Sequence, residues 1–171
     1  MEFKVGEKVV YPNQGVGVIQ KVMETRIAGQ QAEFYMLKLT SNNSTVMVPT
    51  ANALHVGLRK LCTVEQLDEL FQILRNEIGK PESDWKSRYK ENVNKMKSGS
   101  IFQVAEVLKN LYCLNLQKTL SFREKKMFDR ARQLVVSEIA TVQDEPDEGV
   151  AEHVEQMLSS ACEGANPSLP S

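Results

Sequence analysis

The chain has 171 residues, of which 42% are hydrophobic, 25% charged and only 6% aromatic, which is ordinary for a soluble globular protein. This length fits one large domain or two small ones. The longest apolar runs are far shorter than the roughly 20 residues that span a bilayer, and the N-terminus lacks the apolar centre of a signal peptide. We therefore expect a cytoplasmic protein with no membrane partner.

The formal net charge of −1 conceals a strongly basic block. Residues 1–84 are nearly balanced, with nine Lys or Arg and ten Asp or Glu. Residues 85–132 carry twelve basic and four acidic side chains, whereas residues 133–171 carry eight acidic side chains and no Lys or Arg. A block this basic indicates a polyanionic partner, although solvated helix faces would produce the same pattern. The acidic end either screens the basic block or keeps the domain soluble.

Three cysteines, Cys62, Cys113 and Cys162, are spaced roughly 50 residues apart without a CxxC pair. The two histidines are too few and too scattered to complete a zinc site with them. We predict buried free thiols in preference to reactive or metal-binding ones, and we expect no disulfide-stapled secreted fold. The sequence thus predicts no metal site and no cofactor.

The first sixty residues have the pattern of short strands separated by turns. Segments rich in β-branched and alternating apolar residues occur at 8–12, 16–27, 33–39 and 45–49, with Gly and Asn between them. Four or five such strands predict a small, strongly bent antiparallel sheet or barrel. Because some 60 residues make a marginal core, we expect this domain to lean on its neighbour or on a partner.

After the strands, the apolar period changes from two to 3.6 residues, which indicates helices. Capping-box pairs, Thr63 with Gln66 and Ser121 with Glu124, mark the starts of the first and fourth helices. The first predicted helix runs over about 64–78. Gly79, Pro81 and Ser83 then break the chain, and a second helix carries Trp85 and ends near Gly99. Three more helices are predicted over about 100–116, 122–142 and 150–158.

The predicted architecture is therefore α+β with two domains. Residues 1–60 form the small antiparallel β-domain, residues 61–162 form an all-α bundle of about five helices, and residues 163–171 form a disordered tail.

The single tryptophan of the chain stands among three cations, Lys86, Arg88 and Lys90. Trp85 shares its helical spacing with Tyr89, so one interpretation is a core anchor. The other interpretation is an exposed ring, because Trp85 lies in the first turn and an indole N–H often keeps one edge in water. An exposed indole flanked by cations suits a protein pocket or a DNA base step entered from the minor groove.

A basic patch of this size would bind DNA weakly and without sequence preference, with an affinity that falls as salt rises. An aromatic wedge on such a patch works well only if another module delivers it, since tethering makes the second contact intramolecular. The β-domain is the candidate tether.

Several segments, taken in order over about residues 1–140, match one known family. They are "FKVGEKVVYPNQGVGVI", "EFYMLKL", "TVMVP", "VGLRKL", "WKSRYKEN", "GSIFQVAEVLKNLY" and "LSFREKKMFDRARQLVVSEI". Together they resemble the bacterial transcription factor family CarD, also called CdnL. The motif "VYPNQGVG" alone would be less specific, because transcription-repair coupling factors share that β-domain.

The resemblance implies a Tudor-like N-terminal domain that docks on the β subunit of bacterial RNA polymerase. It also implies a helical domain whose tryptophan wedges into the minor groove of promoter DNA at the upstream edge of the transcription bubble. The expected consequence is a more stable open promoter complex, largely independent of DNA sequence. We expect a monomer that associates with the nucleoid through RNA polymerase.

Two sets of DNA-contacting residues follow. The resemblance places Trp85 at the tryptophan position of the family. Directly after it stands a basic stretch with Lys86, Arg88, Tyr89 and Lys90. Charge alone adds four residues of the fourth predicted helix, which are Lys125, Lys126, Arg130 and Arg132.

On the β-domain, Arg26 matches an arginine that the family uses against polymerase. Met47 occupies a strand position where some members carry a second arginine and others a methionine, so the polarity of this contact stays open. An exposed strand edge could pair with a strand of the polymerase. The expected contact residues are Arg26, Ile27, Met47, Val48 and Pro49.

Other function classes fit the residues less well. A Tudor-like reader of methylated side chains needs an aromatic cage, and the few aromatics of the β-domain are needed in its core. No nucleophile–base pairing or Gly-rich phosphate loop is visible, so we predict no catalytic residue and no enzyme. A sequence-specific repressor would need a helix-turn-helix and a dimer face, which we do not identify. The remaining alternative is a Tudor-like protein-interaction adaptor without a DNA role.

Overall fold

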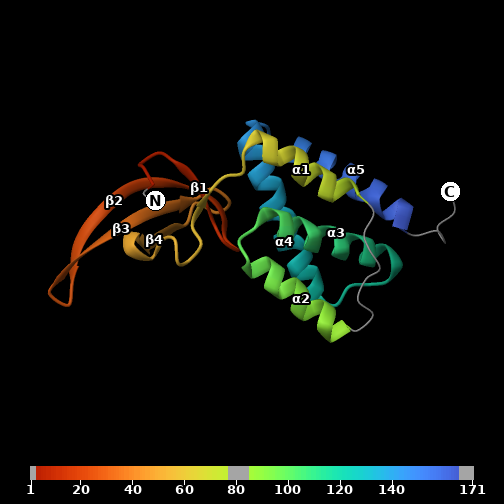
Figure 1. Ribbon diagram of the computed structural model, residues 1–171, viewed down its shortest axis with the longest axis horizontal. Helices are drawn as coiled ribbons and strands as arrows, with labels where there is room; N and C mark the ends of the chain where they lie inside the picture. Colours follow the sequence, from red (N-terminus) through yellow and green to blue (C-terminus); the bar gives the residue numbers. More distant parts are fainter. Residues whose placement is uncertain (1–2, 77–84, 166–171) are drawn as a thin grey trace. The chain divides into compact units, whose positions relative to one another are not determined.

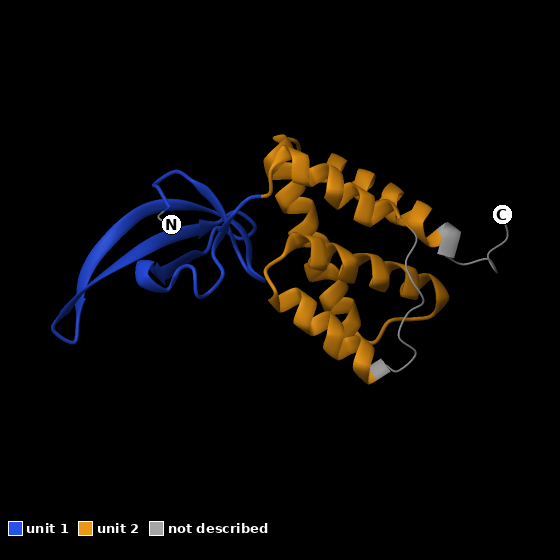
Figure 2. Cartoon of the chain, in the orientation of Figure 1, with its two compact units in different colours: residues 1–61 blue, residues 62–171 orange. Residues whose placement is uncertain are grey.

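The structure is a computed structural model that describes residues 3–76 and 85–165, with side chains over 3–76 and 86–162 (Figure 1). It divides into two compact units, residues 1–61 and residues 62–171 (Figure 2). Unit 1 is an antiparallel β-sheet and unit 2 is helical, which confirms the predicted α+β fold class. Among the described helices, none is both long enough and apolar enough to cross a membrane.

Unit 1 contains one five-stranded sheet in the order β4-β3-β2-β1-β5, and every neighbouring pair is antiparallel. A short 3-10 helix, Thr50–Asn52, follows the fourth strand. The strands are β1 Lys8–Tyr11, β2 Gly15–Ile27, β3 Gln30–Leu39, β4 Thr45–Pro49 and β5 Arg59–Lys60.

The core of unit 1 follows from alternation along its strands. Tyr35, Leu37 and Leu39 occupy every second position of β3 and are all buried. The hydroxyl of Tyr35 accepts a hydrogen bond from the backbone N–H of Phe3 at 3.1 Å, and the two rings meet edge-on. This contact ties the start of the chain to the centre of the sheet.

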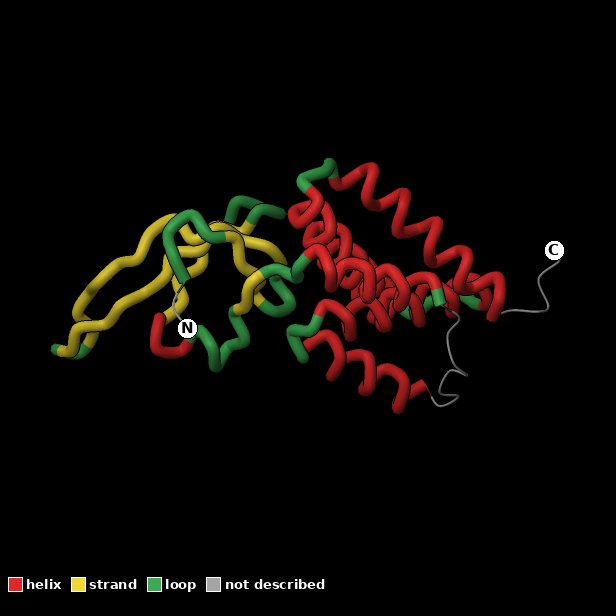
Figure 3. The backbone as a smooth tube through the Cα atoms, turned by 45° about the horizontal axis from the view of Figure 1, so that its top comes forward, coloured by secondary structure: helices red, strands yellow, loops and turns green. Residues whose placement is uncertain are grey.

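The hairpin of β2 and β3 extends beyond this core as a long curved ribbon (Figure 3). Its two-residue turn, Ala28 and Gly29, has positive φ at both positions, which matches the twist of a hairpin. Val22 and Ile27 near the tip are 39% and 55% exposed. The ribbon therefore carries apolar side chains that the sheet itself does not bury.

Unit 2 consists of five helices: α1 Val64–Arg75, α2 Trp85–Lys97, α3 Ile101–Gln117, α4 Phe122–Gln143 and α5 Asp147–Ala165. Both predicted capping boxes form, with Thr63 accepting from the backbone of Gln66 and Ser121 from that of Glu124. The predicted break at 79–83 lies outside the described residues. Helix α5 ends at Ala165, so the first three residues of the tail predicted over 163–171 are helical instead.

Helix α3 lies at the centre of the bundle and packs against each of the other four helices (Figure 1). Its apolar positions, including Val104, Leu108 and Leu111, are buried as the sequence predicts. One apolar residue at the start of α1 behaves differently. Val64 is 67% exposed, because the first residue of α1 precedes the turn where the helix meets the core.

Glu138 and Lys109 are charged side chains that are buried in this bundle and hydrogen-bond to backbone groups near the two ends of α1. Glu138 of α4 accepts a hydrogen bond from the N–H of Cys62 at 2.9 Å. Lys109 of α3 donates to the carbonyls of Ile73 and Asn76 at the end of α1, at 2.6 and 3.3 Å. Burial lowers the pKa of Lys109 below its ordinary value of 10.5.

The cysteines correct one sequence-based prediction. Cys113 of α3 and Cys162 of α5 form a disulfide, with their Cα atoms 5.3 Å apart, so the prediction of free thiols was wrong for these two. It is confirmed for Cys62, which is a buried cysteine outside this disulfide. Linear spacing cannot reveal a pair separated by 49 residues, since only the packing of α3 on α5 brings the two together.

Candidate nucleic-acid interface

The start of α2 presents two of the predicted DNA-contacting cations to solvent. Lys86 and Lys90 are exposed, whereas Arg88 and Tyr89 are half-buried between them. Trp85 is the first residue of α2, and its side chain lies outside the described residues. The two interpretations of the indole, as a core anchor or as an exposed ring, therefore both stand.

Arg88 links α2 to the first turn of α4. Its Nη2 lies 3.4 Å from a carboxylate oxygen of Glu124, and the two side chains are only 11% and 2% exposed. The other oxygen of Glu124 accepts from the N–H and hydroxyl of Ser121, which completes the capping box. Arg88 thus connects the starts of α2 and α4, and the carboxylate of Glu124 largely compensates its charge.

The first three turns of α4 carry most of the exposed positive charge of this helix. We call residues 122–132 the basic segment. Among the described residues, no carboxylate lies within ion-pair distance of the exposed side chains of Lys125, Lys126 and Arg130. The α2 residue Lys90 is in the same situation. No carboxylate of the described residues therefore compensates the charge of these four cations by an ion pair.

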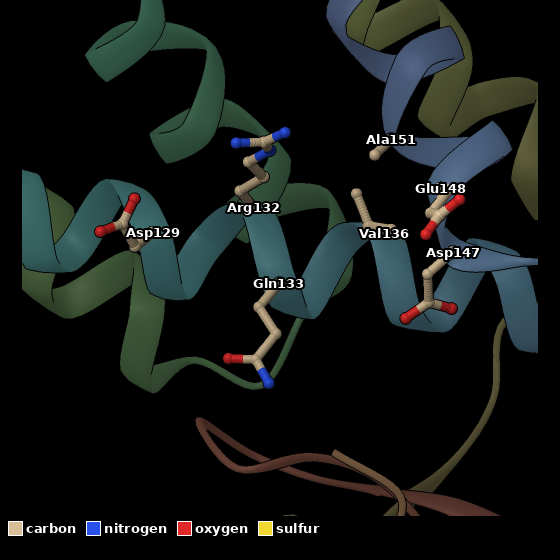
Figure 4. A pocket seen from close by; sticks show the side chains of 7 residues that line it. All are labelled: Asp129, Arg132, Gln133, Val136, Asp147, Glu148 and Ala151. Atoms are coloured by element: carbon tan, nitrogen blue, oxygen red, sulfur yellow. The ribbon is translucent and has the colours of Figure 1, made fainter. Parts of the chain in front are cut away.

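Arg132, at the end of the basic segment, has a different environment. It lines an open pocket of about 310 Å³ with three carboxylates, those of Asp129, Asp147 and Glu148 (Figure 4). Acidic side chains at the start of α5 reduce the positive potential that Arg132 offers to a phosphate. Of the four residues predicted from charge on α4, Lys125, Lys126 and Arg130 are exposed and do not line this pocket, and all four stay predictions.

Sequence reasoning missed one residue of this surface. Phe122 begins α4 and is 72% exposed, and the Nζ atom of Lys126 lies 4.6 Å from the centre of its ring. The signal that could have found it is its place directly after the N-cap Ser121, off the apolar stripe that the later turns of α4 bury.

The predicted polymerase-contacting residues of unit 1 lie on both faces of the sheet. Met47 pairs with Met36 across β4 and β3, while Val48 pairs with Tyr35 and is 2% exposed. Directly opposed residues share a face, so Met47 faces outward and Val48 inward. Val48 therefore belongs to the core, and its side chain is not available to a partner.

The other four residues of this set are exposed. Ile27 is 55% and Met47 48% exposed, and Arg26 and Pro49 are also at the surface. Arg26 pairs with Gln31 near the tip of the ribbon, one position along from Ile27. Adjacent strand residues point to opposite faces, so Ile27 and Arg26 lie on opposite faces of the ribbon.

Comparison with known proteins matches both units. A model of the "CarD-like/TRCF RID domain" matches residues 3–62, and one of the "CarD, C-terminal domain" matches residues 69–155. YdeB of Bacillus subtilis (strain 168), described as a candidate transcription factor, is similar to this chain. The two are 31% identical over 140 residues, which cover 82% of this chain and 92% of YdeB.

Solved structures of two Myxococcus xanthus domains are similar to the first unit. The N-terminal domain of CdnL is 42% identical, and the alignment covers 35% of this chain and 84% of that domain with a TM-score of 0.31. The 72-residue N-terminal domain of CarD is 37% identical, covering 34% and 79% with a TM-score of 0.31. On the family models and the similarity to YdeB, this chain belongs to the CarD family of transcription factors.

Proposed function

We propose that this protein docks on the β subunit of RNA polymerase through unit 1 and stabilises the open promoter complex through unit 2. In this proposal Trp85 wedges into the minor groove at the upstream edge of the transcription bubble. Lys86, Lys90, Lys125, Lys126 and Arg130 hold the neighbouring phosphates, and Arg88 positions the helix that carries the tryptophan.

The observation that supports this proposal best is the basic segment of α4. Its exposed cations Lys125, Lys126 and Arg130 meet no carboxylate among the described residues, so each is able to neutralise a phosphate. The buried pair of Arg88 and Glu124 joins this segment to the start of α2, where Trp85 lies. Cations and tryptophan therefore belong to one corner of unit 2.

Unit 1 offers the features that a docking module needs. Its ribbon exposes Ile27 beside the cation Arg26, and β4 is an edge strand with Met47 on its outward face. An edge strand with neighbouring apolar side chains supports pairing with a strand of a partner protein. Docking through unit 1 raises the effective DNA concentration at unit 2, which compensates for the small basic surface.

Substitution of Trp85 tests the DNA part of the proposal, and substitution of Arg26 tests the docking part. With Trp85→Ala we expect unchanged polymerase binding and a lifetime of the open complex about five- to tenfold shorter, measured by competitor challenge of preformed promoter complexes. Arg26→Glu should weaken capture by an isolated β-subunit lobe and leave DNA binding by the free chain unchanged. An unchanged lifetime with correctly folded Trp85→Ala would refute the wedge.

A further inference from the structure

Phe122 is the most exposed of the large apolar side chains in the part of the chain that the structure describes. At 72% exposure its ring contributes almost nothing to the core of unit 2, whereas Met127 and Phe128 of the same helix pack against that core. A benzyl group left in water gains nothing for folding. The ring is therefore available to a partner.

The side chains around Phe122 specify what that partner would be. Arg123, Lys125 and Lys126 are exposed, and the only acid of the first two turns, Glu124, is 2% exposed and committed to Arg88 and Ser121. The ammonium of Lys126 lies over the ring at 4.6 Å, one helical turn away, as in a cation–π pair. An aromatic ring with three cations and no available carboxylate complements a nucleic acid.

The backbone position of Phe122 is also fixed. The capping box of Ser121 and Glu124 sets the first turn of α4, and the ion pair of Glu124 with Arg88 connects that turn to α2. Phe122 therefore stands next to the helix start that carries Trp85, on a turn that is anchored at two points. Because the backbone of this turn is already ordered, stacking of the side chain on a ligand costs only its own rotamer entropy.

We infer that Phe122 is a second aromatic contact to DNA, which stacks on an unpaired base while Lys125 and Lys126 hold the adjoining phosphates. This inference rests on the proposed function and extends it, because a base is available for stacking only where the duplex is already open. Aromatic–base stacking tolerates any base, so the contact adds preference for forked DNA without adding preference for a sequence.

The chain contains a matched control for this residue. Val64 is also the apolar first residue of a helix with a capping box and is 67% exposed, but its neighbours in α1 are the acids Glu65, Asp68 and Glu69. Truncation of Val64 removes exposed apolar surface from an equivalent helix position in an acidic environment. It therefore separates a specific DNA contact from a general effect of surface truncation.

The experiment compares binding of the full chain to a duplex and to the same duplex with a forked single-stranded end, by anisotropy at low salt. Phe122→Ala should weaken binding to the forked DNA about fivefold and change binding to the duplex less than twofold. Phe122→Tyr should retain the fork preference, and Val64→Ala should behave as the unmodified chain. A 2-aminopurine in the single-stranded arm should lose its quenching with Phe122→Ala alone of these three variants.

The outcomes separate this inference from the proposed function. Equal weakening on both DNAs, or none, would overturn the stacking role of Phe122. A loss of polymerase binding by Phe122→Ala without any change on forked DNA would show instead a protein contact and would equally overturn it. If Trp85→Ala leaves the lifetime of the open complex unchanged while Phe122→Ala abolishes the fork preference, then the wedge fails and the stacking contact stands.

Discussion

Helices α1 and α4 begin in the same way and then diverge. Each starts with a capping box, and each places an exposed apolar residue, Val64 or Phe122, directly after the cap. The next turns of α1 expose acids, and α1 packs on the acidic helix α5, whereas α4 exposes cations beside α2. Capping chemistry thus determines where a helix begins, and the charges that follow determine which partner its surface suits.

The disulfide should stabilise α1 and α5 more than the start of α4. Cys113–Cys162 closes a separation of 49 residues and holds α5, on which α1 packs, to the central helix. Its reduction should lower the free energy of unfolding by about 3–4 kcal/mol, measured by urea unfolding with and without reductant. Amide exchange should accelerate in α1 and α5 first.

The control for this prediction is the double variant Cys113→Ser/Cys162→Ser, whose stability should not respond to reductant. Faster amide exchange at the start of α4 than in α5 upon reduction would contradict the prediction that the disulfide mainly stabilises α1 and α5.

The third helical residues of the two capping boxes, Glu124 and Gln66, should contribute very differently to the free energy of unfolding. Glu124→Ala removes the carboxylate beside the nearly buried Arg88 as well as a cap, and should destabilise unit 2 by about 3 kcal/mol. Gln66→Ala removes only an exposed cap interaction and should cost about 1 kcal/mol or less. Thermal or urea unfolding of both variants checks this difference, and equal losses would show that the Arg88 pair has no special weight.

Lys109 allows a pH test at the end of α1. Burial lowers its pKa, an effect that Glu106 partly offsets and Lys95 reinforces, so the folded chain loses this proton at a lower pH than the unfolded chain. The unfolded state then binds more protons, and stability due to Lys109 rises with pH between the lowered pKa and 10.5. The difference in urea midpoint between the unmodified chain and Lys109→Met should grow over this alkaline range in favour of the unmodified chain. A constant difference would contradict it.

The smallest effect concerns a single cation. Lys125→Gln should reduce the slope of log affinity for DNA against log salt by about 0.9, which corresponds to the loss of one phosphate contact. Glu69→Gln on α1 is the matched neutralisation on the acidic side and should leave that slope unchanged. Anisotropy titrations over a series of salt concentrations measure both, and similar slopes for the two variants would remove the distinction between the helices.

Local rules account for most of what could be predicted. The strand at 33–39 and the apolar face of α3 were predicted from the sequence, because strand and helix periods depend only on residues a few positions apart. The capping boxes at Thr63 and Ser121 were predicted for the same reason. Burial of Val48 could also be foreseen in principle, since its strand partner Tyr35 is a core residue, but that needs the register of the sheet.

The sequence by itself determined the fold class, the family and the basic block, because composition, periodicity and motif order do not depend on distant contacts. Only the tertiary structure decided which cations lie next to a carboxylate. Arg88 forms an ion pair with Glu124, 36 residues away, and Arg132 lines a pocket with the acids of α5. Lys125 and Lys126 have no carboxylate within ion-pair distance among the described residues. The pairing of Cys113 with Cys162 and the exposure of Phe122 likewise follow from helix packing, since a linear pattern contains no distances between helices.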